Sequence, residues 1–127
     1  MKNPLEKSRP RLLITMGDVA GVGPEIIARA WPDLVPLCQP VIIGDPVWLQ
    51  KGLRLVRTTA QVVEVKHPAE AMSARDLIPC VNSSDQNLTD VQSGKVSGAA
   101  GRAAYDYLTA AIDWTLKGEA AGIVTAP

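Results

Sequence analysis

The sequence contains little that would commit the protein to nucleic acid or to a membrane. Its 127 residues carry 13 basic and 13 acidic side chains, so the formal net charge is zero. No long run of one charge suggests nucleic acid or a charged membrane surface as a partner. The longest apolar runs are far too short to span a bilayer, and the charged N-terminal residues 1–11 lack the apolar run of a signal peptide. We therefore expect a cytoplasmic globular protein with no nucleic-acid and no membrane partner.

Cysteine and histidine, the softer metal ligands, are equally scarce. The chain has only Cys38, Cys80 and His67, and the two cysteines are far apart without CxxC spacing. A structural zinc site needs about four soft ligands, so cysteine and histidine alone cannot supply one here. We expect two reduced, mostly buried thiols, with a disulfide left open as the lesser possibility. His67 precedes a proline and is expected to be a solvated loop residue, so no metal ligand is assigned.

Apolar runs alternate with helix-like segments, which predicts an α/β fold with a largely parallel sheet and flanking helices. Strands are expected at residues 11–16, 39–44, 61–65, 76–81 and 121–127, and helices at 24–31, 46–53 and 97–117. Asp45 is expected to cap the second helix and Gly118 to end the third. Pro79 places its strand towards a sheet edge. The last strand is apolar and is expected to be buried, yet no helix follows it, so we expect an incomplete sheet.

Helical spacing also predicts which faces are buried. In the first helix we expect an inward stripe that ends at Pro32 and consists of Ile26, Ile27 and Ala30. In the long helix we expect a core face made of Ala104, Leu108, Ala111, Ile112, Thr115 and Leu116.

A glycine-rich turn, "GDVAGVGPE" at residues 17–25, joins the first strand to the first helix. Gly21 and Gly23 can adopt positive φ and let a ligand approach the backbone. The dinucleotide fingerprint would need a third glycine or an alanine where Ile26 stands, and no Gly-Lys-Ser/Thr sequence follows. Asp18 and Glu25 would also repel a bare phosphate. The turn is therefore expected to order a tight corner or to bind a cation or hydroxyl, unless Asp18 and Glu25 only cap the helix.

Two segments carry a family resemblance. "ITMGDVAGVGPEI" (14–26) resembles the N-terminal signature of the 4-hydroxythreonine-4-phosphate dehydrogenase family, and residues 93–127 resemble its long helix and the strand that ends Thr-Ala-Pro. Val19 stands where the family usually has proline, and Gly98 where it usually has alanine. The resemblance implies part of an isocitrate/isopropylmalate dehydrogenase-like fold, in which two α/β lobes enclose a site and the protein is a homodimer.

The implied activity is an NAD-dependent oxidation and decarboxylation of a phosphorylated small molecule, 4-phosphooxy-threonine, in pyridoxal phosphate biosynthesis. The resemblance also implies a divalent metal (Zn, Mg or Co), held in that family by histidines that lie beyond the position of Pro127. We therefore expect residues 1–127 to be the N-terminal portion of one α/β lobe, with the remainder of the enzyme absent and this fragment inactive alone. Two alternatives stay open: part of a related 4-phospho-threonate or -erythronate dehydrogenase, and a non-enzymatic α/β binding module.

No residue is assigned a catalytic role. Loops at the carboxyl ends of parallel strands host ligands in α/β sheets, and they hold the residues expected to face the cleft: Asp18, Gly21, Gly23 and Thr125. Lys95 could meet a phosphate, but a solvated loop lysine is the preferred interpretation. The aromatic residues of the long helix are expected to pack or to form dimer surface, namely Tyr105, Tyr107 and Trp114.

Overall fold

Five parallel strands form one sheet in the computed structural model, which describes residues 9–127. The order across the sheet is β3-β4-β2-β1-β5, so chain neighbours are not always sheet neighbours. All four ladders are parallel, and the predicted α/β fold is confirmed. The strands are β1 (Arg11–Thr15), β2 (Gln39–Ile43), β3 (Gln61–Glu64), β4 (Leu77–Val81) and β5 (Gly122–Thr125).

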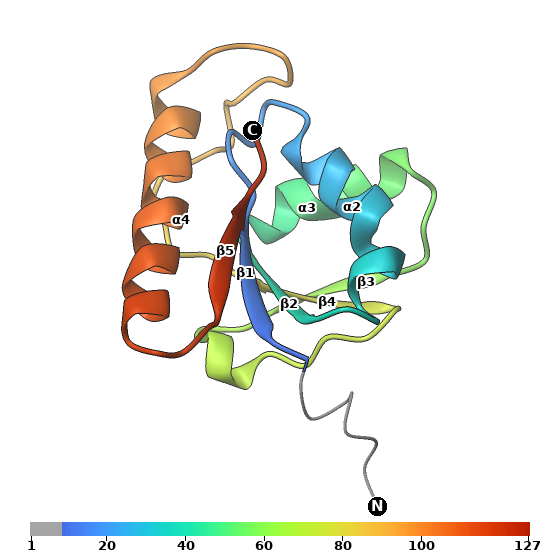
Figure 1. The fold of residues 1–127 in the computed structure, drawn as a ribbon. Coiled ribbons are helices and arrows are strands. Elements are labelled where there is room, and N and C mark those ends of the chain that lie inside the picture. The colour runs from blue at the N-terminus through green and yellow to red at the C-terminus, as the bar shows by residue number, and fades with distance from the viewer. Residues whose placement is uncertain (1–8) are drawn as a thin grey trace, which may run out of the picture.

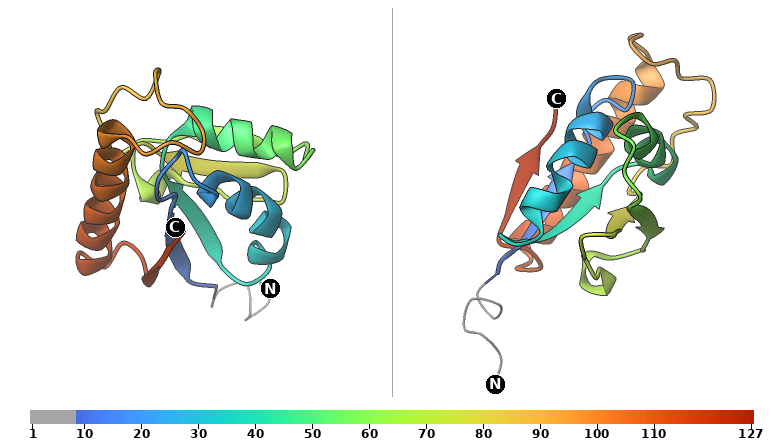
Figure 2. Two further views of the ribbon diagram at one scale, coloured as in Figure 1. Left: turned by 90° about the horizontal axis from the view of Figure 1, so that it is seen from above. Right: turned by 90° about the vertical axis from the view of Figure 1, so that its right-hand side faces the viewer.

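Helices cover both faces of the sheet. α2 (Gly23–Leu34) and α3 (Pro46–Leu55) pack together on one face, and α4 (Gly98–Leu116) covers the other, as Figures 1 and 2 show. A short 3₁₀ turn, η1, spans Pro68–Glu70. Asp45 caps α3 as predicted, since its carboxylate accepts from the Trp48 N–H at 3.0 Å. Each helix within residues 9–127 is too short or too polar to span a bilayer.

The core has one apolar layer on each face of the sheet. Trp31 of α2 is buried on one side, where its Nε1–H donates to the Ala74 carbonyl at 2.8 Å. Tyr107 of α4 is fully buried on the other side. The strands between these layers are buried on both faces, as expected for a parallel sheet. Cys38 and Cys80 are buried and free, so the reduced-thiol interpretation is confirmed.

The expectation that Pro79 marks an edge strand is wrong. β4 lies between β3 and β2, and β3 and β5 are the edges. The ladder between β4 and β2 pairs only Ile42 with Cys80 and Ile43 with Val81. Because this ladder begins after Pro79, the missing N–H costs no ladder bond towards β2.

The buried faces predicted for α2 and α4 are also wrong. α2 continues past Pro32 to Leu34. The exposed proline removes only the bond to the Ala28 carbonyl, and the Val35 N–H still donates to the Trp31 carbonyl at 3.3 Å. In the same helix Ile26 is 45% exposed, while Ile27 is buried. The buried face of this helix also contains Ala28 and Trp31.

The long helix faces the sheet with a different set of side chains from the predicted one. α4 buries Ala100, Ala103, Tyr107 and Ala111, so only Ala111 of the predicted core face is buried. The small alanines let the helix approach the sheet closely, and Tyr107 fills the remaining space.

The expectation of a buried final strand is wrong as well, because β5 is an edge strand in which Val124 is 49% exposed.

Candidate functional site

The carboxyl ends of the parallel strands meet at one edge of the sheet. Gly17 and Asp18 lie just beyond β1, Gly44 and Asp45 follow β2, and Pro127 lies two residues beyond β5. Ligands of open α/β sheets bind outside this edge, in the loops that lead from strand to helix. This edge of the sheet is therefore the candidate location of a ligand site.

Close backbone packing explains two of the glycines in the first of these loops. Gly17 has φ +73°, and a Cβ there would lie 2.4 Å from the Pro127 carbonyl oxygen. A Cβ on Gly23 would lie 2.0 Å from the Met16 carbonyl oxygen. Only glycine allows α2 to start this close to the end of β1. The expectation of positive φ at Gly21 and Gly23 is wrong: this conformation occurs instead at Gly17, Gly94 and Gly118.

Asp18 orders this loop. Its Oδ1 accepts from the Ala20 N–H at 2.8 Å, and its carbonyl accepts from the Gly21 N–H at 2.9 Å. Asp18 therefore caps a tight turn before α2 and does not cap the helix itself, whose N-cap Val22 makes no side-chain bond. Glu25 lies in the first helical turn and pairs with Arg29 at 3.0 Å. The predicted tight corner is confirmed.

A second loop approaches this corner from far along the chain. The Gly94 N–H donates to the Ala20 carbonyl at 2.7 Å. A hollow of about 220 Å³ lies at the junction, and its lining includes Asp18, Gly21 and Lys95. The fold thus joins two of the predicted cleft residues to the lysine that sequence reasoning set aside. No local signal in the sequence reveals this meeting, because it depends on both loops reaching the same edge of the sheet.

The other two predicted cleft residues lie apart from this hollow. Gly23 is buried, and a Cβ there would lie 3.5 Å from the Ala126 side chain. Thr125 is exposed on the edge strand, where it pairs in register with Thr15. Their roles as cleft residues stay predictions, while the structure brings Asp18 and Gly21 together beside Lys95.

His67 is not the solvated loop residue that the sequence suggests. It is half-buried, its Nδ1 accepts from the Ala69 N–H at 3.0 Å, and its Nε2 lies 2.6 Å from Oε2 of Glu119. Its ring meets Trp114 edge-on, with the ring centroids 5.8 Å apart. These contacts fasten the segment after β3 to the segment before β5. Within residues 9–127, no group of three or more potential ligands is arranged to hold a metal ion.

Two further nucleophilic side chains, Cys80 and Tyr107, belong to the core. Burial raises the pKa of the Cys80 thiol, and the nearby carboxylates of Asp45 and Glu64 raise it further. Burial is also the main cause of the raised pKa of Tyr107. Both groups stay protonated and enclosed, so neither is placed to attack a substrate.

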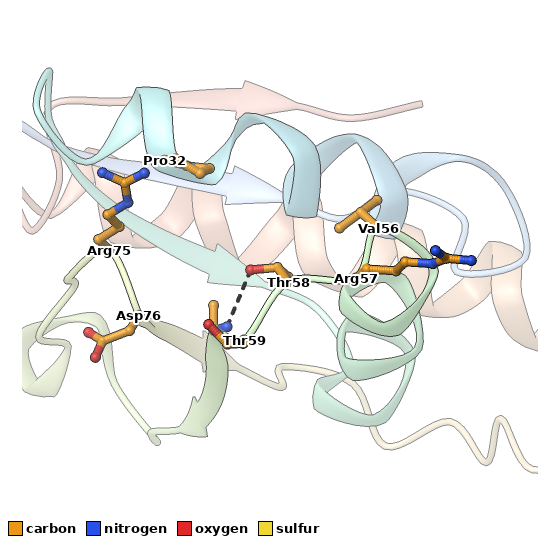
Figure 3. Close-up of a pocket in the computed structure, with 8 residues that line it drawn as sticks. Pro32, Val56, Arg57, Thr58, Thr59, Arg75 and Asp76 are labelled. Atoms are coloured by element: carbon orange, nitrogen blue, oxygen red, sulfur yellow. Dashed lines mark hydrogen bonds between the residues drawn. The ribbon is translucent and has the colours of Figure 1, made fainter.

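A larger hollow, about 700 Å³, lies at the opposite end of the sheet, before β3 and β4. Its lining includes Arg57, which has φ 55°, and Arg75. Figure 3 shows these two guanidinium groups at opposite ends of the hollow and Asp76 pointing away from both. The charged groups do not converge on one point, so this hollow lacks the arrangement that an anion site needs.

Comparison with known proteins agrees with this fold. The chain matches the crystal structure of a 4-hydroxythreonine-4-phosphate dehydrogenase from Burkholderia phymatum with a TM-score of 0.88 and 30% identity, over 94% of this chain and 36% of that one. The corresponding enzyme from Klebsiella pneumoniae matches with a TM-score of 0.82 and 32% identity, over 93% and 37% of the two chains. The fold is thus of the isocitrate/isopropylmalate dehydrogenase-like α/β class.

The sequence itself gives the family. Residues 36–127 match the model of pyridoxal phosphate biosynthetic protein PdxA, so the chain belongs to the PdxA family. A 4-hydroxythreonine-4-phosphate dehydrogenase from Trichlorobacter lovleyi is 38% identical over 94% of this chain. A relative from Symbiobacterium thermophilum, provisionally named a D-threonate 4-phosphate dehydrogenase, is 32% identical over the same share. The chain spans about 36% of the length of each of these two relatives.

Proposed function

We propose that this chain is the N-terminal part of one lobe of a cytoplasmic, homodimeric dehydrogenase that depends on NAD and a divalent metal. Its substrate would be a phosphorylated small molecule, 4-phosphooxy-threonine, which the enzyme oxidises and decarboxylates in pyridoxal phosphate biosynthesis. The observation that carries the proposal is the match of almost the whole chain, at a TM-score of 0.88, to an enzyme named for this substrate. The family match over residues 36–127 supports the proposal from the amino-acid sequence alone.

The proposed reaction has two stages. Oxidation of the substrate hydroxyl gives a ketone, and the resulting β-keto acid then loses carbon dioxide. Bound NAD would accept the hydride, and a divalent cation would supply Lewis acidity. The side chains within residues 9–127 do not fit a metal site, because no three or more histidine, cysteine, aspartate or glutamate side chains gather at one place. Neither NAD nor the metal therefore has an assigned ligand among the described residues.

This chain's own residues would contribute binding surface. Asp18 holds the turn that leaves Gly21 exposed at the hollow, and Lys95 adds a positive charge there. A phosphate is the part of the proposed substrate that an ammonium group would attract, and this attraction opposes the repulsion expected from Asp18, whose carboxylate already accepts the Ala20 N–H. Asp18 thus has a positioning role and Lys95 a binding role in this proposal.

The activity assay is direct. The purified 127-residue chain is mixed with 4-phosphooxy-threonine, NAD and zinc, magnesium or cobalt, and NADH absorbance is followed. We expect no NADH, because the described residues lack a metal site, whereas the Burkholderia phymatum enzyme serves as the positive control. Metal-dependent turnover by this chain alone would contradict the proposed inactivity.

The proposed pathway needs its own test. In a bacterial strain that requires pyridoxine because its 4-hydroxythreonine-4-phosphate dehydrogenase is deleted, the 127-residue chain should not restore growth. The family resemblance implies an Asn-Lys pair directly after the Thr-Ala-Pro strand and a substrate-binding His-Thr pair further on. The open reading frame extended past the codon for Pro127, if it continues into these sequences, should restore growth. A stop codon directly after Pro127, together with a stable folded chain, would favour the non-enzymatic binding module instead.

A related substrate is the second candidate. The Symbiobacterium thermophilum relative, at 32% identity, is named for D-threonate 4-phosphate, which carries a hydroxyl in place of the amine. The extended frame, assayed with both substrates, separates the two functions by the ratio of their kcat/KM values. A ratio that favours 4-phospho-threonate would replace the first proposal with the second.

A further inference from the structure

The connections between strands and helices single out one position along the carboxyl edge of the sheet. β2 leads into α3 on one face, whereas β4 leads into α4 on the other face (Figure 2). β2 and β4 are neighbours in the sheet, so the chain leaves these two adjacent strands in opposite directions. Such a switch point opens a crevice outside the strand ends, where open α/β sheets bind ligands. This crevice differs from the hollow beside Asp18, which lies beyond β1.

Two hollows lie at the switch point. One, of about 290 Å³, lies between the start of α3 and the connection from β4 to α4, and its lining includes Asp45, Trp48 and Leu88. The other, of about 210 Å³, extends from Trp48 to Gly21 of the glycine-rich corner. Each is smaller than the roughly 300–1,000 Å³ of a small-molecule site, whereas the two together reach that range.

Trp48 and Lys51 line both hollows, so this pair of side chains separates them. Lys51 Nζ lies 4.0 Å from the centroid of the Trp48 ring in a cation–π contact. Trp48 is 6% exposed, and the ammonium group covers one face of its indole. Because such a contact is weak at an exposed position, Lys51 can swing outward. The two hollows then join into one groove, which has the Trp48 ring as its floor.

Lys51 is the charge of this lining that is available to a ligand. Glu25 pairs with Arg29 at 3.0 Å, and Asp45 Oδ1 accepts the Trp48 N–H at 3.0 Å. Lys51 is exposed and forms no ion pair within residues 9–127. An anionic group that enters the groove therefore meets a cation that has no competing carboxylate partner.

Hydroxyl groups complete the lining. Thr89 contributes one to the larger hollow and Ser93 one to the smaller, and both residues are exposed. The groove thus offers an aromatic face, an unpaired cation and hydroxyl groups. A nucleotide carries the matching parts in one molecule, namely a planar base, a phosphate and a ribose.

We propose that the Trp48–Lys51 groove binds a purine nucleotide. The purine takes the place of the ammonium group on the Trp48 ring, because its two fused rings match the indole in size and stack on it. The released Lys51 pairs with the phosphate on the side of Gly21 and Ser93, away from the Asp45 carboxylate. The NAD of the proposed function contains an adenine nucleotide, so the inference deepens that proposal and rests on it for the source of the ligand.

Titration calorimetry with three probes tests the groove. AMP carries both the base and the phosphate, adenosine lacks the phosphate, and ribose 5-phosphate lacks the base. AMP should bind the 127-residue chain, and each of the other two probes should bind at least about tenfold more weakly. The absence of AMP binding at millimolar concentration would overturn the proposal. Ribose 5-phosphate that binds as tightly as AMP would overturn it as well, because the base would then contribute nothing.

These titrations are separate from the test of the proposed function. AMP has no hydride acceptor, so its binding does not depend on whether the chain, or a longer form of it, is a dehydrogenase. An inactive chain that binds AMP supports the groove, and an active longer form that fails to bind AMP refutes the groove alone.

A variant of Lys51 tests the role of the ammonium group. Lys51→Ala should raise the dissociation constant of AMP at least about tenfold, while adenosine should bind at least as tightly as before, because the indole is then uncovered. Arg54→Ala is the matched control, since Arg54 is another exposed cation of α3 and lies outside both hollows. This control should bind AMP as the wild type does. An equal loss in both variants, or a parallel loss of adenosine binding, would overturn the assignment of Lys51.

The indole N–H signals locate the bound base. The chain has three tryptophans, and each gives one Nε1–H signal in a ¹H–¹⁵N spectrum. AMP should shift the signal of Trp48, which Trp48→Phe identifies by its loss. The signals of Trp31, whose Nε1–H donates to the Ala74 carbonyl, and of Trp114, near the end of α4, should stay in place. AMP that shifts one of these two signals and leaves Trp48 unchanged binds elsewhere, and this result would overturn the proposal.

Discussion

Among the glycines of residues 17–25 other than Gly17, the replacement of Gly23 by alanine should lower the free energy of unfolding the most. The new Cβ would lie 2.0 Å from the Met16 carbonyl oxygen and 3.2 Å from the Met16 carbonyl carbon. Ordinary contact begins near 3.4 Å, so the start of α2 must move about 1.4 Å away from the end of β1. Both partners are buried backbone, so no flexible side chain can absorb the overlap.

The cost follows from what that movement loosens. α2 buries Ile27, Ala28 and Trp31 against the sheet, and its shift would loosen this packing. Overpacking in a core costs about 1–3 kcal/mol, and the rigidity of this contact places Gly23→Ala near the upper end, at about 3 kcal/mol. For a chain of this size that corresponds to a fall in Tm of roughly 10 °C.

Urea unfolding followed by tryptophan fluorescence measures this cost, because Trp31 and Trp48 are buried and report on the α2 and α3 layer. Gly21→Ala is the matched comparison. Its Cβ would lie 3.3 Å from the Asp18 carbonyl oxygen, which is close to ordinary contact, so the loss should be clearly smaller. A Gly23→Ala variant within about 0.5 kcal/mol of the wild type would refute the argument, since that is the size of an ordinary surface substitution.

Three further predictions concern the core and the caps. Tyr107→Phe should raise the free energy of unfolding by about 1 kcal/mol in urea titrations, because the buried hydroxyl has no hydrogen-bond partner among the described residues. Asp45→Ala should lower it by about 1 kcal/mol in the same assay through loss of the α3 cap, whereas Asp45→Asn should keep most of that stability. Stability should also fall as pH rises above about 9, because the Cys80 thiol has a raised pKa in the folded state and ionises first in the unfolded chain. Cys80→Ala should lower stability at neutral pH but flatten this alkaline decline.

The sequence predicts the elements well because their signals are local. Each strand is an apolar run between turn residues, and Asp45 with Pro46 marks a helix start that depends only on neighbouring backbone. The order of the strands in the sheet cannot be predicted from local signals, because it depends on which crossover connections form. Pro79 illustrates the limit: its missing N–H argues for an edge, but the short ladder between β4 and β2 begins one residue later.

The predictions of the buried helix faces were wrong for another physical reason. In α4, apolar and small residues occur on most sides, so helical periodicity alone cannot distinguish a face that meets the sheet from one that meets solvent. The larger residues Leu108 and Ile112 suggested the core face, yet the sheet takes the alanines and Tyr107. The hollow beside Asp18 was equally beyond local reasoning, since Lys95 reaches it only through the Gly94–Ala20 hydrogen bond.

The glycine-rich corner shows how scaffold and site divide the same short segment. Gly17 and Gly23 are required by backbone packing, because any side chain there would collide with main-chain atoms. Gly21 is exposed, and the nearest atom to a Cβ there would be the Asp18 carbonyl oxygen at 3.3 Å, so this position could accept a side chain at modest cost. If a substrate approaches the backbone in this corner, Gly21 is therefore the position where glycine serves binding more than folding. A Gly21→Ala variant should keep nearly all of its stability, which makes it the cleanest probe of ligand contact that the corner offers.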